Sequence, residues 1–263
     1  STQAKTLFPY TTLFRSYFIG AGPGDPDLVT VKAQKILQIA DAVLFTGSLV
    51  PKEVLSWCKS EAIIEDSQSM KYPEIFDFLV KHKDKIVARV HTGDPSIYST
   101  IAKQIEFLKE QNIEYKVIPG ITAAFGAASS LGIEYTIPGV SQTLILSRIE
   151  GKTPNPEKLE NILACKNSSL AFYLSILLLK KLKSTALKLG YSKDTPCWVV
   201  EKATWEDEKI YKGTIDNIEE QVSHINGVAL ILFGDYLNQK ETEESHLYVK
   251  PLVKELKENR KNK

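Results

Sequence analysis

The sequence predicts an α/β protein with two domains, the first built on a mainly parallel sheet and the second on a mixed sheet. Between residues 17 and 131, short β-branched or aromatic runs alternate with stretches in which apolar residues recur at helical intervals. This alternation is typical of a parallel sheet with helices on both faces. Beyond residue 190, strand-like runs follow one another directly, which indicates a mixed sheet.

The first domain is expected at residues 17–135. Its first helix shows the pattern most clearly, because Val31, Ile36, Leu37 and Ala40 recur at helical spacing and Thr30 is a suitable N-cap. The same criteria, applied in order, predict strands at 17–19, 42–45, 62–65, 86–90 and 115–118, and helices at 30–40, 51–58, 72–82, 97–111 and 122–131.

The second domain is expected at residues 136–237, after glycine and proline cluster near 134–138. Its predicted strands are 143–147, 170–174, 196–204, 209–214 and 228–233, and its helices are 157–165, 177–189 and 217–224. Residues 1–16 lack the compact apolar core of a signal peptide, so we expect an extension outside the fold. Residues 238–263 are rich in lysine and glutamate, which predicts a solvated, charged tail.

Composition excludes several classes of protein. The 263 residues carry 33 basic and 32 acidic side chains, and this balance argues against binding nucleic acid mainly through charge. Cys58, Cys165 and Cys197 lie far apart and outside metal-ligand spacing, which predicts a reducing compartment, the cytoplasm, and no metal site. No apolar run reaches the roughly 20 residues of a membrane span, so we expect no membrane partner.

A glycine-rich loop, residues 20–26 (GAGPGDP), joins the first predicted strand to the first helix. The dinucleotide-binding fingerprint G-x-G-x-x-G fails here because the third glycine comes one residue early. Pro23 and Pro26 also remove two N–H groups that a phosphate would need. The glycines are therefore expected to allow a tight turn or a close approach of the backbone to another group.

Two further loops, residues 91–98 (HTGDPSIY) and 119–123 (PGITA), also follow strands and precede helices. Open α/β sheets bind ligands at the carboxyl edge of their strands, where all three loops should meet. Together they predict a ligand site. His91 can be a hydrogen-bonded structural imidazole or a catalytic group, and the sequence leaves both interpretations open.

Basic residues near strand ends of the second domain could hold an acidic substrate, although exposed lysines most often lie on a solvated face. The candidates are Arg148, Lys152, Lys180 and Lys202. No nucleophile–base pair stands out, and neither G-x-S-x-G nor H-E-x-x-H occurs. The catalytic residues therefore stay unassigned.

In their order and spacing, the three loops resemble the tetrapyrrole methylase family over residues 17–237. The resemblance implies two α/β domains of the tetrapyrrole methylase type, with the methyl donor S-adenosyl-L-methionine in the cleft between them and S-adenosyl-L-homocysteine as product. It also implies a tetrapyrrole substrate and a homodimer. Short sequence motifs at 136–138 (TIP), 150–154 (EGKTP), 202–205 (KATW) and 207–209 (DEK) resemble those of one branch of the family. That branch methylates C11 of precorrin-4, with or without cobalt, in cobalamin biosynthesis.

The resemblance also implies a set of cofactor-binding residues, carried over position by position. They are Gly22, Pro23, Gly24, Thr92, Gly93, Asp94, Ile97, Thr122, Ala123, Leu174 and Ala203. Ser99 departs from the pattern, since many relatives have glycine after the tyrosine of the second loop.

Two alternatives stay open. Another tetrapyrrole methylase, such as a uroporphyrinogen III C-methyltransferase, would share the three loops, although the 150–154 and 202–209 phrases favour C11. A nucleotide-binding module without turnover is disfavoured by the failed phosphate fingerprint. The missing nucleophile–base pair is compatible with methyl transfer, because aligning two reactive partners can contribute roughly 7–11 kcal/mol.

Overall fold

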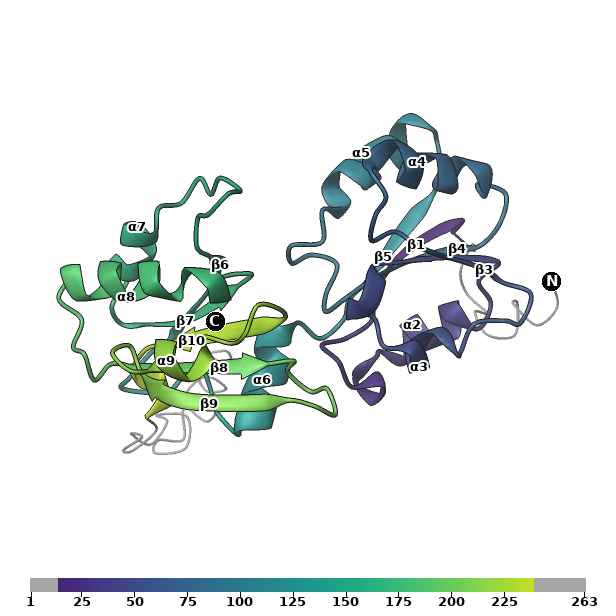
Figure 1. The fold of residues 1–263 in the computed structure, drawn as a ribbon. Helices are drawn as coiled ribbons and strands as arrows, with labels where there is room; N and C mark the ends of the chain where they lie inside the picture. Colours follow the sequence, from purple (N-terminus) through teal and green to yellow (C-terminus); the bar gives the residue numbers. More distant parts are fainter. Residues whose placement is uncertain (1–13, 239–263) are drawn as a thin grey trace, which may run out of the picture. The chain divides into compact units, whose positions relative to one another are not determined.

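The computed structural model describes residues 14–238, and its contacts divide the chain into two compact units (Figure 1). Unit 1 comprises the described residues up to Gly126 together with Lys202–Asp207, and unit 2 comprises Ala127–Glu201 and the described residues from Glu208. This division falls inside a helix, before the expected boundary at 135/136, because Gly126 still packs against loop residues of unit 1. The charged tail at 239–263 lies outside the described residues.

Unit 1 contains a five-stranded sheet in the order β3-β2-β4-β1-β5. Every neighbouring pair in it is parallel, as predicted. Its strands are β1 (Ser16–Gly20), β2 (Ala42–Phe45), β3 (Ile63–Asp66), β4 (Val87–His91) and β5 (Tyr115–Ile118). Its helices are α2 (Val31–Leu37), α3 (Lys52–Leu55), α4 (Tyr72–Lys81), α5 (Ile101–Glu110) and the start of α6 (Ala123–Leu131), with 3-10 turns at Pro26–Leu28 and Gly47–Leu49.

Helices cover both faces of this sheet, with α2 and α3 on one side and α4 and α5 on the other (Figure 1). The alternation of side chains along a strand produces the two cores. Tyr17 and Ile19 of β1 pack in the cluster that contains Ile36 of α2, whereas Phe18 packs in the cluster that contains Leu79 of α4. Burial on both faces explains why each strand reads as a nearly continuous apolar run.

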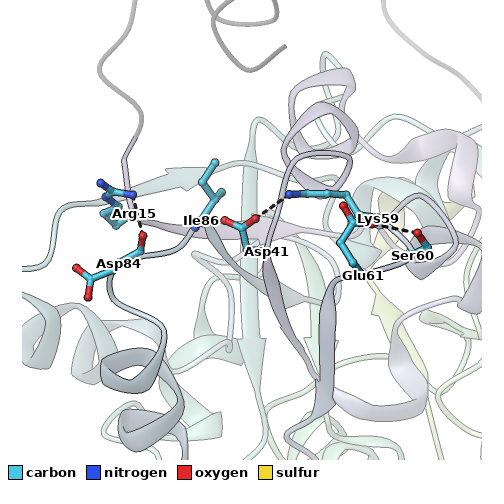
Figure 2. Close-up of polar contacts among 7 residues, drawn as sticks. All are labelled: Arg15, Asp41, Lys59, Ser60, Glu61, Asp84 and Ile86. Atoms are coloured by element: carbon cyan, nitrogen blue, oxygen red, sulfur yellow. Dashed lines mark hydrogen bonds and ion pairs between the residues drawn. The ribbon is translucent and has the colours of Figure 1, made fainter. Parts of the chain in front are cut away.

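Polar contacts fix the amino-terminal edge of this sheet (Figure 2). The Asp41 carboxylate accepts hydrogen bonds from Lys59 Nζ at 2.7 Å and from the Ile86 N–H at 2.8 Å. Burial raises the pKa of Asp41, but these two donors outweigh it and the pKa is lowered. Arg15 donates to the Asp84 carbonyl at 2.9 Å. Because Arg15 makes this contact and β1 begins one residue later, the expected extension 1–16 is too long at its end.

Unit 2 contains a second five-stranded sheet, in the order β6-β7-β10-β8-β9. It is mixed, as predicted, since β6 and β7 are parallel and the other pairs are antiparallel. Its strands are β6 (Thr143–Arg148), β7 (Ser168–Tyr173), β8 (Pro196–Glu201), β9 (Lys209–Thr214) and β10 (Ala229–Phe233). Its other helices are α7 (Leu159–Ala164), α8 (Leu179–Lys188) and α9 (Ile218–Val222), with 3-10 turns at Ile176–Leu178 and Asp235–Leu237.

One hydrophobic core fills the face of this second sheet under α7, α8 and α9. Leu163, Leu182 and Ile218 from the three helices pack with Phe172 and Phe233 from the central strands. Within the described part of the chain, no helix is long and apolar enough to cross a membrane.

Two element boundaries differ from the predicted ones for the same physical reason. The helix predicted at 97–111 begins at Ile101, because Tyr98 and Thr100 have left-handed φ values of 53° and 54°. The strand predicted at 196–204 ends at Glu201, because Lys202 and Thr204 have φ values of 51° and 67°. Residue propensity does not reveal these left-handed positions, which tertiary contacts impose on non-glycine residues.

Candidate functional site

The three predicted loops lie at the carboxyl edge of the unit 1 sheet, where they follow β1, β4 and β5. We call them loop 1 (residues 20–26), loop 2 (91–98) and loop 3 (119–123). β1 and β4 are neighbours, yet the chain leaves β1 toward α2 on one face and β4 toward α5 on the other (Figure 1). Such a reversal is the place where open α/β sheets bind their ligands.

Glycines let the three loops meet at backbone distance. A Cβ on Gly20 would lie 2.5 Å from the Gly93 carbonyl oxygen, and a Cβ on Gly120 would lie 2.1 Å from the same atom. Gly22 and Gly93 also pair as a β-bridge, with the Gly93 N–H donating to the Gly22 carbonyl at 2.7 Å. Any other residue at 20 or 120 would therefore force the loops apart.

Asp94 ties loop 2 to loop 3. Its Oδ2 accepts a hydrogen bond from the Gly120 N–H at 2.8 Å, and its Oδ1 accepts from the Ser96 N–H at 2.8 Å and from the Ser96 hydroxyl. Both carboxylate oxygens are thus engaged by the protein. The resemblance implies that Asp94 binds the cofactor, and its contacts indicate that it shapes the loops around such a ligand.

Loop 1 is held by backbone groups and by the β8–β9 connection (Lys202–Asp207), which belongs to unit 1 by its contacts. The Ala21 N–H donates to the His91 carbonyl at 2.8 Å. The Asp25 N–H donates to Thr204 Oγ1 at 3.0 Å, and Trp205 Nε1 donates to the Pro23 carbonyl at 3.0 Å. The N–H groups of loop 1 are therefore largely committed to protein acceptors.

Left-handed backbone conformations of non-glycine residues occur in both units. Among the described residues they are Tyr98, Thr100, Asn112, Leu174, Lys202 and Thr204. All but Asn112 lie in or beside loop 2, at the end of β7 or in the β8–β9 connection. Strained positions of this kind persist where the surrounding structure over-determines them, which is frequent at ligand sites.

The residues predicted to bind the cofactor fall into two groups. Unit 1 brings together Gly22, Pro23, Gly24, Thr92, Gly93, Asp94, Ile97, Thr122, Ala123 and Ala203, on its three loops and the β8–β9 connection. Leu174 belongs to unit 2, where it follows β7 with a φ of 52° and a 75% exposed side chain.

Two of the predicted substrate anchors are engaged by the protein. The Arg148 guanidinium donates to the Thr153 carbonyl at 3.0 Å and to the Pro154 carbonyl, so it holds the segment after β6. Lys202 forms an ion pair with Asp207. Their contacts indicate a structural role.

The other two predicted anchors lie on the surface of unit 2. Lys152 is exposed in the segment after β6. Lys180 of α8 is also exposed, and it borders a hollow of about 500 Å³ that carries charges of both signs, with Lys183 and Asp216 among its lining. Of the four predicted anchors, these two are the ones left to offer a charge to a substrate.

His91 is the last residue of β4 and the first of loop 2. Its side chain is 3% exposed, its ring centroid lies 6.0 Å from that of Phe18, and its Nε2 has no hydrogen-bond partner among the described residues. Burial, and to a lesser degree the Arg89 charge, lower the pKa of His91 to about 3. A general acid or base works best with a pKa near the operating pH, so the structural interpretation of His91 is favoured.

From the sequence, Trp205 belongs to a family motif and Thr204 is also one of the polar residues near strand ends, but neither residue could be assigned a role. Their contacts with loop 1 join residues that lie 179 and 182 positions apart in the sequence, and local sequence patterns do not reveal contacts of that range. Gly24 is the sequence feature that the contact explains, since a Cβ there would lie 2.3 Å from the Trp205 ring, but the glycine alone does not point to Trp205.

Comparison with known proteins gives a consistent result. The profile of the family described as Tetrapyrrole (Corrin/Porphyrin) Methylases matches residues 15–219. A cobalt-precorrin-4 C(11)-methyltransferase of Methanocaldococcus jannaschii is 42% identical over 249 residues, covering 92% of this chain and 96% of the relative. A precorrin-4 C(11)-methyltransferase of Pseudomonas aeruginosa is 40% identical over 238 residues, covering 88% and 94%.

Solved structures agree with the sequence comparisons. A cobalt-precorrin-4 methyltransferase superposes with a TM-score of 0.81 at 42% identity, covering 84% of this chain and 95% of that one. A uroporphyrin-III C-methyltransferase of Thermus thermophilus, solved with S-adenosylhomocysteine, superposes with a TM-score of 0.72 at 25% identity, covering 85% and 99%.

Proposed function

The chain belongs to the tetrapyrrole (corrin/porphyrin) methylase family, and we propose that it transfers a methyl group from S-adenosyl-L-methionine to C11 of precorrin-4 or cobalt-precorrin-4 in cobalamin biosynthesis. Relatives with the cobalt-containing and the cobalt-free substrate in their names are almost equally similar, at 42% and 40% identity. The proposal therefore covers both forms. We further propose a cytoplasmic homodimer, the dimer being what the family resemblance implies.

The observation that carries the proposal is the meeting of three glycine loops at the strand-order reversal of the unit 1 sheet. Gly20, Gly93 and Gly120 bring the loops so close that a single added Cβ would collide with backbone. Asp94 then locks two of the loops together. This construction fixes the three loops against one another at the carboxyl edge of an open sheet, which is where such sheets bind small molecules.

The residues of loop 1 are compatible with an adenosyl sulfonium donor and disfavour a nucleotide. A phosphate cradle needs several free N–H groups, yet the N–H groups of Ala21, Gly22 and Asp25 all donate to protein acceptors. Pro23 and Pro26 have none. A donor without phosphates makes no such demand. This argues against the nucleotide-binding alternative left open by the sequence.

S-adenosyl-L-methionine, when bound, supplies a methyl group already activated by a positively charged sulfur. The chain's own residues then need to bind, orient and exclude water, since the conjugated tetrapyrrole supplies the carbon that accepts the methyl group. Backbone of loops 1 to 3 would hold the donor, with Pro23, Ile97 and Ala123 as apolar contacts. Orientation of this kind can contribute roughly 7–11 kcal/mol to lowering the barrier.

A binding experiment tests the donor assignment directly. Isothermal titration of the full chain with S-adenosyl-L-methionine, S-adenosyl-L-homocysteine and ATP should give saturable binding of the first two and none of the third. Binding of ATP alone would support the nucleotide-binding module and refute the proposal. A parallel assay with uroporphyrinogen III and labelled donor should show no transfer, and efficient transfer to it would favour the other branch of the family.

A further inference from the structure

We propose that Thr204 and Trp205 are positioning residues, which hold loop 1 in the conformation that binds the methyl donor. The inference rests on the proposed function, and it adds a role for the β8–β9 connection that the family resemblance does not give. Both residues act through loop 1, since their polar atoms reach its backbone.

Two side-chain hydrogen bonds link the connection to loop 1 on either side of Gly24. Trp205 Nε1 donates to the Pro23 carbonyl at 3.0 Å, and Thr204 Oγ1 accepts from the Asp25 N–H at 3.0 Å. The Gly22 carbonyl, in the peptide group before Pro23, is already held by the Gly93 N–H at 2.7 Å, so the two side chains fix the part of loop 1 that follows this bridge. The two bonds together fix the buried turn of loop 1 on both sides of Gly24.

The shapes of the two segments are matched as well. A Cβ on Gly24 would lie 2.3 Å from the Trp205 ring, so the glycine leaves the space that the indole fills. A Cβ on Gly126 would lie 2.9 Å from Pro23 and 3.0 Å from the Thr204 methyl group. Glycines on both sides of the contact therefore allow the connection to press against loop 1.

The connection adopts strained backbone to reach this position. Lys202 and Thr204 both have left-handed φ values, 51° and 67°, although neither is glycine. The Lys202–Asp207 ion pair and the hydrogen bond from the Trp205 N–H to the Lys202 carbonyl, at 3.0 Å, close the segment into a tight turn. The left-handed backbone and the closing contacts of the β8–β9 connection therefore place the side chains of Thr204 and Trp205 against loop 1.

The inference predicts a loss of donor affinity without loss of the chemistry. Removing one hydrogen bond that orders a binding loop should weaken binding of S-adenosyl-L-methionine by roughly three- to ten-fold. At saturating donor the loop is held by the ligand itself, so kcat should stay near that of the parent chain. Binding of the tetrapyrrole should change little.

The test compares four variants of the full chain. Trp205→Phe removes the N–H that bonds to the Pro23 carbonyl but keeps an aromatic ring. Thr204→Val removes the hydroxyl that accepts from the Asp25 N–H, and Thr204→Ser keeps that hydroxyl. Trp57→Phe is the matched control, because Trp57 packs at the periphery of the same unit's core. Calorimetry gives the dissociation constant of the donor, and amide hydrogen exchange without ligand reports the order of residues 20–28.

Trp205→Phe and Thr204→Val should bind the donor more weakly and exchange faster across residues 20–28, whereas Thr204→Ser and Trp57→Phe should match the parent. Unchanged exchange and unchanged affinity in the first two variants would overturn the inference. If the parent chain binds no S-adenosyl-L-methionine, the proposed function fails, and hydrogen exchange alone still decides whether Thr204 and Trp205 hold loop 1.

Discussion

Replacing Asp94 by alanine should reduce stability and donor affinity together. The substitution removes the acceptor of the Gly120 N–H at 2.8 Å and of the Ser96 N–H at 2.8 Å. Hydrogen bonds to a charged group contribute about 1.5–3 kcal/mol each. The Ser96 bond is local and solvent-exposed, so we expect a total loss of about 2–3 kcal/mol in the free energy of unfolding. Loops 2 and 3 would separate, and affinity for S-adenosyl-L-methionine should fall at least about ten-fold.

Asp66 provides a matched control at the end of β3. Its carboxylate accepts from the Gly47 N–H at 2.9 Å and from the Gln68 N–H at 2.8 Å, the same pattern in a loop outside the predicted site. Asp66→Ala should therefore lower stability comparably and leave donor affinity within about two-fold of the parent. Urea denaturation gives the stabilities and calorimetry the affinities. If Asp94→Ala also keeps its affinity, Asp94 does not shape the donor site.

Three further substitutions test other parts of the account. Gly120→Ala should abolish binding of S-adenosyl-L-methionine in calorimetry, because the added Cβ would lie 2.1 Å from the Gly93 carbonyl oxygen. Gly227→Ala is the control and should bind normally, since its Cβ would meet open space. Equal affinities of the two variants would contradict the loop geometry. Arg148 holds the segment that carries Lys152, a predicted substrate anchor, so Arg148→Ala should raise the KM for the tetrapyrrole and leave the affinity for S-adenosyl-L-methionine unchanged. Lysine should rescue little, since only a guanidinium spans two carbonyls; an unchanged KM would refute this. The pKa of His91 is 6.5 in the unfolded chain and about 3 in the folded one. As the pH falls between these values, the unfolded state takes up the proton first, so the free energy of unfolding decreases by at most about 1.4 kcal/mol per pH unit. His91→Gln should flatten the fall of Tm from pH 7 to pH 4.5, and an unaltered slope would argue against the lowered pKa.

The order of elements could be predicted because it follows from local periodicity. Continuous apolar runs marked the strands buried on both faces, and the predicted ranges of β2 and β5 match the observed ones. The parallel first sheet and mixed second sheet are likewise confirmed. The start of α5 was predicted wrongly because left-handed residues before Ile101 depend on contacts distant in sequence.

The candidate site could be placed from sequence, but the roles of its residues could not. Strand–loop–helix order brought loops 1 to 3 to one edge, which the structure confirms. Asp94 and Arg148 were both predicted to contact ligands, yet their charges are engaged by backbone groups of neighbouring segments. A charged residue in a sequence does not reveal whether a protein group or a ligand meets it. The full set of cofactor contacts, and the cleft between the domains, stay predictions.

Turnover under anaerobic conditions decides whether the chain methylates C11 of precorrin-4 or cobalt-precorrin-4. Purified chain would receive S-adenosyl-L-methionine with a labelled methyl carbon, together with precorrin-4 or cobalt-precorrin-4, and the product would be analysed by mass spectrometry and carbon NMR. We expect the gain of one methyl group, located at C11, on at least one of the two substrates. Label at another ring carbon, or no transfer to either substrate by a chain that binds the donor, would contradict the assignment to C11.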